Sequence, residues 1–361
     1  MSRARNLADL LDANGDVASG ALDNVPSSND ASALTTGTLP VARVPYVGRR
    51  NLIINGAMQV WQRGTSFSSS GYTADRWSWS GGGAGSISRQ SFTVGSEIED
   101  SPYYLRWAIT GNSQNLELLQ KIEDVRTAAG KTCTLSFWAK SSSNETLGWA
   151  VYQNFGSGGS SLTAADGGTY TATTSWQKFT FTFDMPSISG KTIGTNHYVW
   201  VRIAQMQTTN TPTLDFAGVQ LEVGSVATPF EHRSYGEELA LCQRYFQQSS
   251  QAGGNPYANR YVPIFKYDSA GYWYGHQEFP VPMRTAPTMT TSLGASGTWG
   301  MWWEGTGTSS LTSGLPTCDG SRHGFHFYLN NNVSTVGYGG MTTHGDGSSS
   351  YRWEWFADAE L

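Results

Sequence analysis

Short segments in which apolar and polar residues alternate constrain the fold of this chain more than any other feature. In residues 178–183 the apolar positions are Phe179, Phe181 and Phe183, and lysine or threonine lies between them. Residues 133–140 alternate in the same way. Side chains two positions apart lie on one face of a strand, so each segment predicts a strand with a buried face. Several such segments without intervening helices predict an antiparallel β-sandwich of jelly-roll type, with an up-and-down barrel as the alternative.

The composition agrees with an all-β fold. Aromatic residues make up 13% of the 361 residues and charged residues only 14%, whereas disordered chains are poor in aromatic residues and rich in charge. Glycine is abundant, with 42 residues, and Leu, Lys and Glu are few, which argues against a helical bundle.

Charge, hydropathy and cysteine content exclude several kinds of partner and site. The net charge is −5 and no basic run is longer than Arg49–Arg50, so no nucleic-acid partner is expected. No stretch approaches the ~20 apolar residues that span a bilayer, so no membrane insertion is expected. The three cysteines, Cys133, Cys242 and Cys318, are far apart and odd in number, which predicts neither a disulfide framework nor a zinc site. We expect no cofactor and no bound metal.

Residues 1–48 differ in composition from the rest of the chain. They contain no aromatic residue before Tyr46 and are rich in Ala, Asp, Asn, Ser, Leu and Val. Such a segment cannot bury a core alone. We interpret it as an extended arm that shares its apolar residues with other copies of the chain, and a flexible linker is the alternative.

One helix is predicted, and it divides the remainder of the chain. Ser234 and Glu237 fit the S-x-x-E capping box. Four residues follow at helical spacing and predict one buried stripe, in a helix that ends near Gln248: Leu239, Cys242, Tyr245 and Phe246. We therefore predict a β domain at 49–233, a linking helix at 234–249 and a second, smaller β domain at 250–361.

Several blocks of sequence, in chain order, resemble parts of phage tail proteins. The string LTTGTLPVARVP at residues 34–45 is similar to a short extended repeat of bacteriophage tail fibres. The string NLIINGAMQVWQRGTSF at 51–67 resembles the opening of a tail-protein domain with a carbohydrate-binding-module-like jelly roll. The blocks at 72–77, 130–140 and 216–233 continue this resemblance.

The resemblance implies a homotrimeric tail fibre, or receptor-binding protein, located in the virion tail and assembled in the host cytoplasm. Residues 1–48 would form the trimer and attach it to other virion tail proteins. Residues 49–233 would be a jelly-roll spacer or sugar-binding module, and 250–361 the receptor-reading tip. Three weak sites would then bind host surface polysaccharide together, through multivalency.

Aromatic residues crowded into apparent loops of the last third are the candidate carbohydrate-binding residues. Flat rings suit the apolar C–H faces of sugars, whose hydroxyl groups need polar partners. The alternative is that these rings fill a core or a subunit interface. The candidates are Tyr272, Trp273, Tyr274, Trp299, Trp302 and Trp303.

No catalytic site is predicted. Glycoside hydrolysis needs two carboxylates held ~5–10 Å apart, and no spacing pairs the acidic residues of the last third. No G-x-S-x-G nucleophile motif occurs. The histidines of the last third lack closely repeated H-x-H pairs and are expected to be neutral: His276, His323, His326 and His344. A polysaccharide-degrading tailspike and a ligand-free structural tail protein are the alternative functions.

Overall fold

The computed structural model describes residues 49–80, 85–98, 101–111, 113–208, 210–249, 261–266, 272–293, 299–303, 307–311, 317–330, 338–342 and 353–361. The chain divides into two compact units, Met1–Gly48 and Arg49–Leu361. The predicted N-terminal arm lies outside the described residues, so its role in trimer formation stays a prediction. The proposed division of the second unit at 234–249 also stays a prediction.

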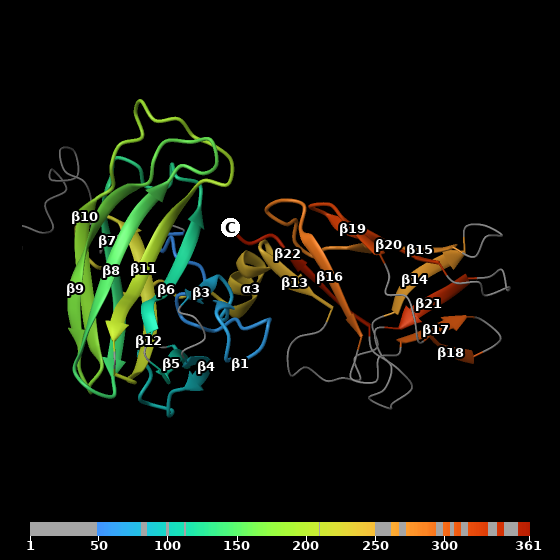
Figure 1. The fold of residues 1–361 in the computed structure, drawn as a ribbon, viewed down its shortest axis with the longest axis horizontal. Helices are drawn as coiled ribbons and strands as arrows, with labels where there is room; N and C mark the ends of the chain where they lie inside the picture. The colour runs from blue at the N-terminus through green and yellow to red at the C-terminus, as the bar shows by residue number, and fades with distance from the viewer. Residues whose placement is uncertain are drawn as a thin grey trace, which may run out of the picture. The chain divides into compact units, whose positions relative to one another are not determined.

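Two antiparallel six-stranded sheets form a sandwich with a shared apolar core (Figure 1). The first sheet has the order β1 (Ser66–Phe67), β4 (Gly85–Ser91), β5 (Tyr103–Ile109), β12 (Thr213–Val223), β7 (Thr132–Ser141) and β10 (Gln177–Asp184). The second has the order β2 (Gly71–Tyr72), β3 (Trp77–Ser80), β6 (Ser113–Glu123), β11 (Tyr198–Thr208), β8 (Glu145–Asn154) and β9 (Thr163–Ala172). The expected all-β class and jelly-roll sandwich are confirmed.

The alternating segments place their apolar side chains in this core, as predicted. Phe183 is 5% exposed, and the rings of Phe179 and Phe181 pack against the core from its rim. The Phe181 ring stacks on that of Trp149, with centroids 4.2 Å apart. Thr180, between these rings, is exposed on the outer face. The period of two therefore identified the buried face of β10 correctly.

The predicted helix is present but shorter than the sequence pattern suggests. Helix α3 spans Tyr235–Gln243, and its capping box joins Ser234 to Glu237 as expected. The predicted extension to Gln248 is wrong, because Phe246–Gln248 forms strand β13 and pairs with β22 (Trp353–Asp358). Tyr245 precedes this strand, and its carbonyl oxygen accepts a hydrogen bond from the Ala359 N–H at 2.8 Å. Pairing with a strand about 100 residues later is a tertiary interaction that helical spacing cannot reveal.

Two further sheets complete the described structure (Figure 1). A three-stranded sheet has the order β13, β22 and β16 (Thr288–Leu293). A seven-stranded sheet has the order β18 (Gly307–Leu311), β17 (Trp299–Trp303), β21 (Tyr338–Thr342), β14 (Tyr261–Lys266), β15 (Tyr272–Glu278), β20 (Gly324–Asn330) and β19 (Thr317–Gly320).

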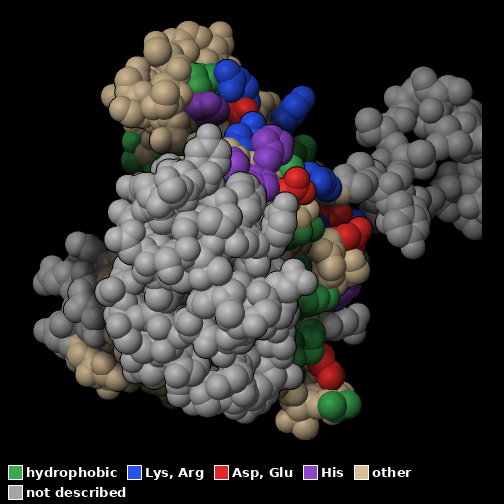
Figure 2. Space-filling view, turned by 90° about the vertical axis from the view of Figure 1, so that its right-hand side faces the viewer, with side chains coloured by type: hydrophobic (Ala, Val, Ile, Leu, Met, Phe, Trp, Pro, Cys, Tyr) green, Lys and Arg blue, Asp and Glu red, His purple; other side chains and the backbone are tan. Residues whose placement is uncertain are grey.

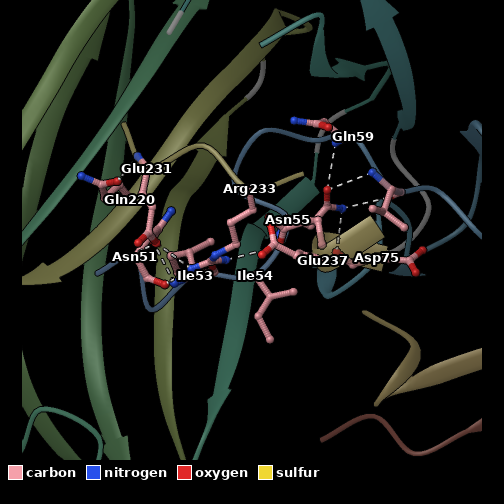
Figure 3. A network of polar contacts seen from close by, with 12 residues as sticks. Asn51, Ile53, Ile54, Asn55, Gln59, Asp75, Gln220, Glu231, Arg233 and Glu237 are labelled. Atoms are coloured by element: carbon pink, nitrogen blue, oxygen red, sulfur yellow. Dashed lines mark hydrogen bonds and ion pairs between the residues drawn. The ribbon is translucent and has the colours of Figure 1, made fainter. Parts of the chain in front are cut away.

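A buried polar network fixes residues 50–62, a loop segment, against the sandwich (Figure 3). The Asn51 side chain accepts hydrogen bonds from the N–H groups of Ile53 and Leu221, at 3.0 and 3.1 Å, and donates to the Val219 carbonyl at 3.0 Å. Asn55 accepts from the N–H of Val60 at 2.9 Å. Each asparagine thus satisfies backbone groups that a buried loop would otherwise leave unpaired.

Charged side chains close the same network from the chain segment before α3. The Glu231 carboxylate accepts hydrogen bonds from the N–H groups of Arg50 and Asn51, both at 2.8 Å. Arg233 donates to the Ile53 carbonyl at 3.0 Å and to Glu231 at 3.0 Å. The block at 51–67 and the block at 216–233 therefore meet in space, and both are structural.

The C-terminal strand is attached to the sandwich by a second set of buried charges. Arg76 is 1% exposed and forms an ion pair with Glu360. Its guanidinium group also lies over the Tyr245 ring, 3.5 Å from the centroid. Breaking a buried pair of this kind typically costs about 3–5 kcal/mol, because one charge is left buried without a partner.

Replacing Phe183 should test the assignment of the sandwich core. We expect Phe183→Ala to lower the free energy of unfolding by about 3–5 kcal/mol, since it opens a cavity in the core. Thr180→Ala, on the exposed face of the same strand, should change it by less than about 0.5 kcal/mol. Chemical denaturation of the two variants measures both values, and equal effects would show that the face assignment is wrong.

Two adjacent glutamates of α3, Glu237 and Glu238, should contribute to the free energy of unfolding with opposite pH dependence. Burial raises the pKa of the Glu238 carboxyl, although the Asn55 N–H, which donates to it, and Arg233 act against this shift. Hydrogen bonds from Ser234 lower the pKa of Glu237. A raised pKa favours the folded state while the group is protonated, whereas a lowered pKa favours it once the group is ionised.

The measurement is the unfolding free energy of wild type, Glu238→Gln and Glu237→Gln as a function of pH. Wild type should lose stability relative to Glu238→Gln as the pH rises from the ordinary value of 4.5 through the raised pKa, at up to about 1.4 kcal/mol per pH unit. Relative to Glu237→Gln, wild type should lose stability as the pH falls from 4.5 through the lowered pKa. If the two differences in unfolding free energy, wild type minus each variant, changed with pH in the same direction, the environments assigned to Glu237 and Glu238 would be wrong.

Candidate functional site

The aromatic residues predicted to bind carbohydrate lie in strands and not in loops. Tyr272–Tyr274 begin β15, and Trp299, Trp302 and Trp303 belong to β17. Both strands are in the seven-stranded sheet, but β14 and β21 lie between them. The expectation of loops is wrong because Gly275 and Gly300 lie within β15 and β17 and do not end these strands. The side chains lie outside the described structure, so their contact with carbohydrate stays a prediction.

Two half-buried rings lie side by side on the outer face of the second sandwich sheet. Trp200 in β11 pairs in register with Tyr152 in β8, and their ring centroids are 5.3 Å apart with an interplanar angle of 37°. Their neighbours Val199, Val201 and Val151 are buried in the core. Because successive side chains in a strand point to opposite faces, the two rings face away from the core.

A charged pair borders these rings. The Arg202 guanidinium lies 5.9 Å from the Tyr152 centroid and 6.0 Å from that of Trp200. It forms an ion pair of 2.5 Å with Glu117 in β6. Arginine beside an aromatic face is a favourable arrangement, and its remaining N–H groups can still donate.

Two hydrogen-bond donors of this face have no acceptor among the residues that the structure describes. They are the Nε1 of Trp200 and the Nε of Arg202. Buried donors in folded proteins nearly always have a partner, so each unpaired one calls for an explanation. Both nitrogen atoms are enclosed by the protein, so a ligand over the rings would meet the ring faces and not these two donors.

Small residues continue the outer face beyond the two rings. The row beside the Trp200–Tyr152 pair runs from Arg202 to Ala150 and Gly167. A Cβ atom added at Gly167 would lie 3.1 Å from the Ala150 Cβ, so no larger side chain fits there without a shift. The two rings are therefore flanked by Ala150, which is buried, and by Gly167, which is exposed.

A second group of rings lies on the outer face of the first sheet. Tyr104 and Trp176 have centroids 5.5 Å apart, and the Phe92 ring is 4.7 Å from that of Tyr104. Asp215 binds the nearby Arg106 at 2.8 Å and Lys140 at 3.5 Å. Burial, and secondarily Asp215, raises the pKa of the Tyr104 hydroxyl. Arg106 and Lys140 are thus already paired with the carboxylate of Asp215.

Neither group of rings was identified from the sequence. The signal was present in β11, where Trp200 and Arg202 occupy the outward positions between Val199, Val201 and Ile203. A large ring at an outward position of a regular strand presents a flat apolar surface to the solvent. The aromatic residues crowded near glycines lie instead in the last third of the chain.

Histidines and membrane spans give no further site. His276 and His326 are paired in register on β15 and β20, with ring centroids 4.6 Å apart. Figure 2 shows histidine side chains beside lysine, arginine and acidic side chains along one border of the surface in view. Within the described ranges, no three His, Cys, Asp or Glu side chains are grouped to hold a metal ion. No helix there is long and apolar enough to cross a membrane.

Residues 73–197 match the sequence model of a carbohydrate-binding domain family, CBM_4_9. The matched segment begins just before β3, includes Tyr152 and ends just before β11. This match supports carbohydrate binding by the sandwich and describes a binding domain rather than a catalytic one. The chain matches none of the curated proteins with which it was compared.

Several solved structures share limited similarity with the chain. A CBM4 structure is 22% identical over 35% of this chain and 74% of its own, with a TM-score of 0.27. The N-terminal cellulose-binding domain of Cellulomonas fimi β-1,4-glucanase C is 14% identical over 47% of this chain and 95% of its own, with a TM-score of 0.31. The enzymatically active domain of tailspike protein 4 from bacteriophage CBA120 is 15% identical over 48% of this chain and 22% of its own, with a TM-score of 0.34. At such values we draw no conclusion about ligand or activity from these three structures.

Proposed function

We propose that this protein binds a surface polysaccharide through the outer face of its second sandwich sheet. The observation that carries the proposal is the pair of adjacent, half-buried rings of Tyr152 and Trp200. The family match over residues 73–197 supports the same ligand class. The term sugar-binding face is used below for Tyr152, Trp200, Arg202 and Glu117.

The chemistry of the sugar-binding face suits a neutral saccharide chain. The apolar C–H side of a sugar ring would stack on Trp200 and Tyr152. Sugar oxygens would accept hydrogen bonds from the Arg202 guanidinium, whose side chain keeps 11% of its surface exposed. Sugar hydroxyl groups would donate to the Glu117 carboxylate, whose charge is balanced by Arg202.

We further propose that the protein is a phage tail fibre or receptor-binding protein that acts as an adhesin. The support is the resemblance of the blocks at 34–45, 51–67 and 216–233 to phage tail proteins. In such a fibre residues 1–48 form a homotrimer and attach it to other tail proteins, and the virion tail is its location. Weak sites on three chains then act together, because each bound site raises the effective concentration of the others.

Replacing Trp200 tests the sugar-binding face directly. A glycan array of bacterial surface polysaccharides first identifies the strongest ligand of the full chain. Trp200→Ala should then weaken binding to that ligand about five- to tenfold, the loss expected for a stacking contact of about 1–1.5 kcal/mol. Trp176→Ala removes another half-buried ring, located just before β10 of the opposite sheet, and should leave the affinity unchanged.

Other outcomes would relocate or replace the proposed activity. A loss of affinity with Trp302→Ala or Trp303→Ala, but not with Trp200→Ala, would move recognition to the seven-stranded sheet. Shortening of the polysaccharide during incubation, measured by size-exclusion chromatography, would show a degrading tailspike. No binding to any array member would leave a structural tail protein.

The oligomeric state tests the proposed role of residues 1–48. Light scattering of the full chain should give a mass three times the chain mass of 39.2 kDa. Removal of residues 1–48 should reduce the measured mass to that of a single chain, while the circular dichroism of the β domains persists. A monomer at micromolar concentration, with residues 1–48 intact, would contradict the trimer.

A further inference from the structure

The three-stranded sheet presents an ordered set of side chains on one face. Strand register aligns Phe246, Asp358 and Thr288 in one row. The next row on the same face aligns Gln248, Phe356 and Thr290. We call these six residues the small-sheet face. Residues two positions apart share a face, so the side chains between these rows point the other way.

The opposite face of this sheet is buried, which leaves the small-sheet face as its open side. Gln247 and Ala357 are 2% and 0% exposed, and Ser249 and Trp355 are 4% and 5% exposed. Trp355 packs there against Phe325, with centroids 5.0 Å apart. On the small-sheet face, by contrast, Thr288 and Thr290 are exposed.

A cavity of about 500 Å³ lies over the small-sheet face, with Arg63 and Glu360 in its wall. This volume falls in the range of about 300–1,000 Å³ that is usual for small-molecule sites. The Arg63 guanidinium lies 3.6 Å from the Phe246 centroid and covers that ring. Since Arg63 belongs to the loop before β1, the cavity is built by residues far apart in the sequence.

The charges around the cavity are balanced. Arg63 pairs with Asp358 at 3.1 Å and with Glu360 at 3.4 Å, and Glu360 also pairs with Arg76. Two guanidinium groups thus face two carboxylates. A charged ligand would have to displace one of these partners, so the charge balance favours a neutral ligand.

The remaining side chains offer a ring and several hydroxyl or carbonyl groups. Phe356 is half-buried, and its ring is tilted 26° from that of Phe246, with centroids 6.5 Å apart. Thr288 and Thr290 are exposed on this face, so their hydroxyls are accessible to a ligand. Asp358 keeps 43% of its side chain exposed beside them. A flat apolar surface next to donors and acceptors matches a polyhydroxylated ring.

We propose that the small-sheet face is a second saccharide-binding site, distinct from the sugar-binding face, which takes a neutral hexose unit. The sugar stacks on Phe356, its hydroxyl groups donate hydrogen bonds to the Asp358 carboxylate, and it exchanges hydrogen bonds with Thr288 and Thr290. This proposal does not depend on the Tyr152–Trp200 pair, because the two sites share no residue. A chain with both sites could hold two positions of one polysaccharide, or two polysaccharide chains.

The test uses the full chain carrying Trp200→Ala, so that the sugar-binding face is impaired. Glucose, galactose, mannose and N-acetylglucosamine are titrated separately, and binding is followed by saturation-transfer NMR and calorimetry. At least one of these sugars should bind, and adding Phe356→Ala should weaken that binding about five- to tenfold. Thr290→Val should also weaken it, whereas Thr285→Val, an exposed threonine outside the cavity, should not.

Three results would overturn the proposal. The first is that none of the four sugars binds. The second is that one sugar binds, but both Phe356→Ala and Thr290→Val leave its affinity unchanged. The third is that glucuronate binds more tightly than glucose. Thr290→Val guards against a folding defect in Phe356→Ala, because Thr290 is exposed. If the sugar-binding face does not bind polysaccharide, the single variant Trp200→Ala will have the same polysaccharide affinity as wild type. The failure of one site can therefore be distinguished from the failure of the other.

Discussion

The structure depends most on the buried hydrogen bonds that hold residues 50–62 against the sandwich. This segment has little regular secondary structure, so its buried backbone groups need side-chain partners. Asn51, Asn55 and Glu231 provide them, and Arg233 neutralises the Glu231 carboxylate. Asn51 and Asn55 lie within the segment itself, whereas Glu231 and Arg233 lie just before α3. Loss of one leaves buried groups unpaired, at a cost of about 1–3 kcal/mol each.

The residues of this network make the fold recognisable, and they are not the residues that we propose to bind saccharide. The blocks at 51–67 and 216–233 are distinctive because their asparagine, glutamate and arginine residues must satisfy particular backbone groups (Figure 3). They form the framework of the sandwich. The sugar-binding face and the small-sheet face are instead built from single outward residues such as Trp200 and Phe356, which carry no motif. A resemblance in motifs therefore supports the fold of the sandwich but does not identify the ligand.

The sequence predicted the all-β class, the buried face of β10 and the capped start of α3, because each follows from local periodicity or capping chemistry. It did not predict the early end of α3, which is set by pairing of β13 with a strand near the C-terminus. The sugar-binding face was not predicted from the sequence for a similar reason. Trp200 and Tyr152 are 48 positions apart, and only strand register makes them neighbours. Local sequence patterns predict which residues are buried, but they do not predict which exposed residues contact each other in the fold.

The indole N–H of Trp200 offers the most direct measurement of the central claim, that the outer face of the second sheet binds saccharide. This donor has no acceptor within the described part of the chain. In ¹⁵N-labelled protein its resonance, assigned by comparison with Trp200→Phe, should move on addition of the polysaccharide identified by array. The Trp176 indole resonance should stay in place. A Trp200 resonance that does not move at saturating ligand, while other resonances do, would contradict the account.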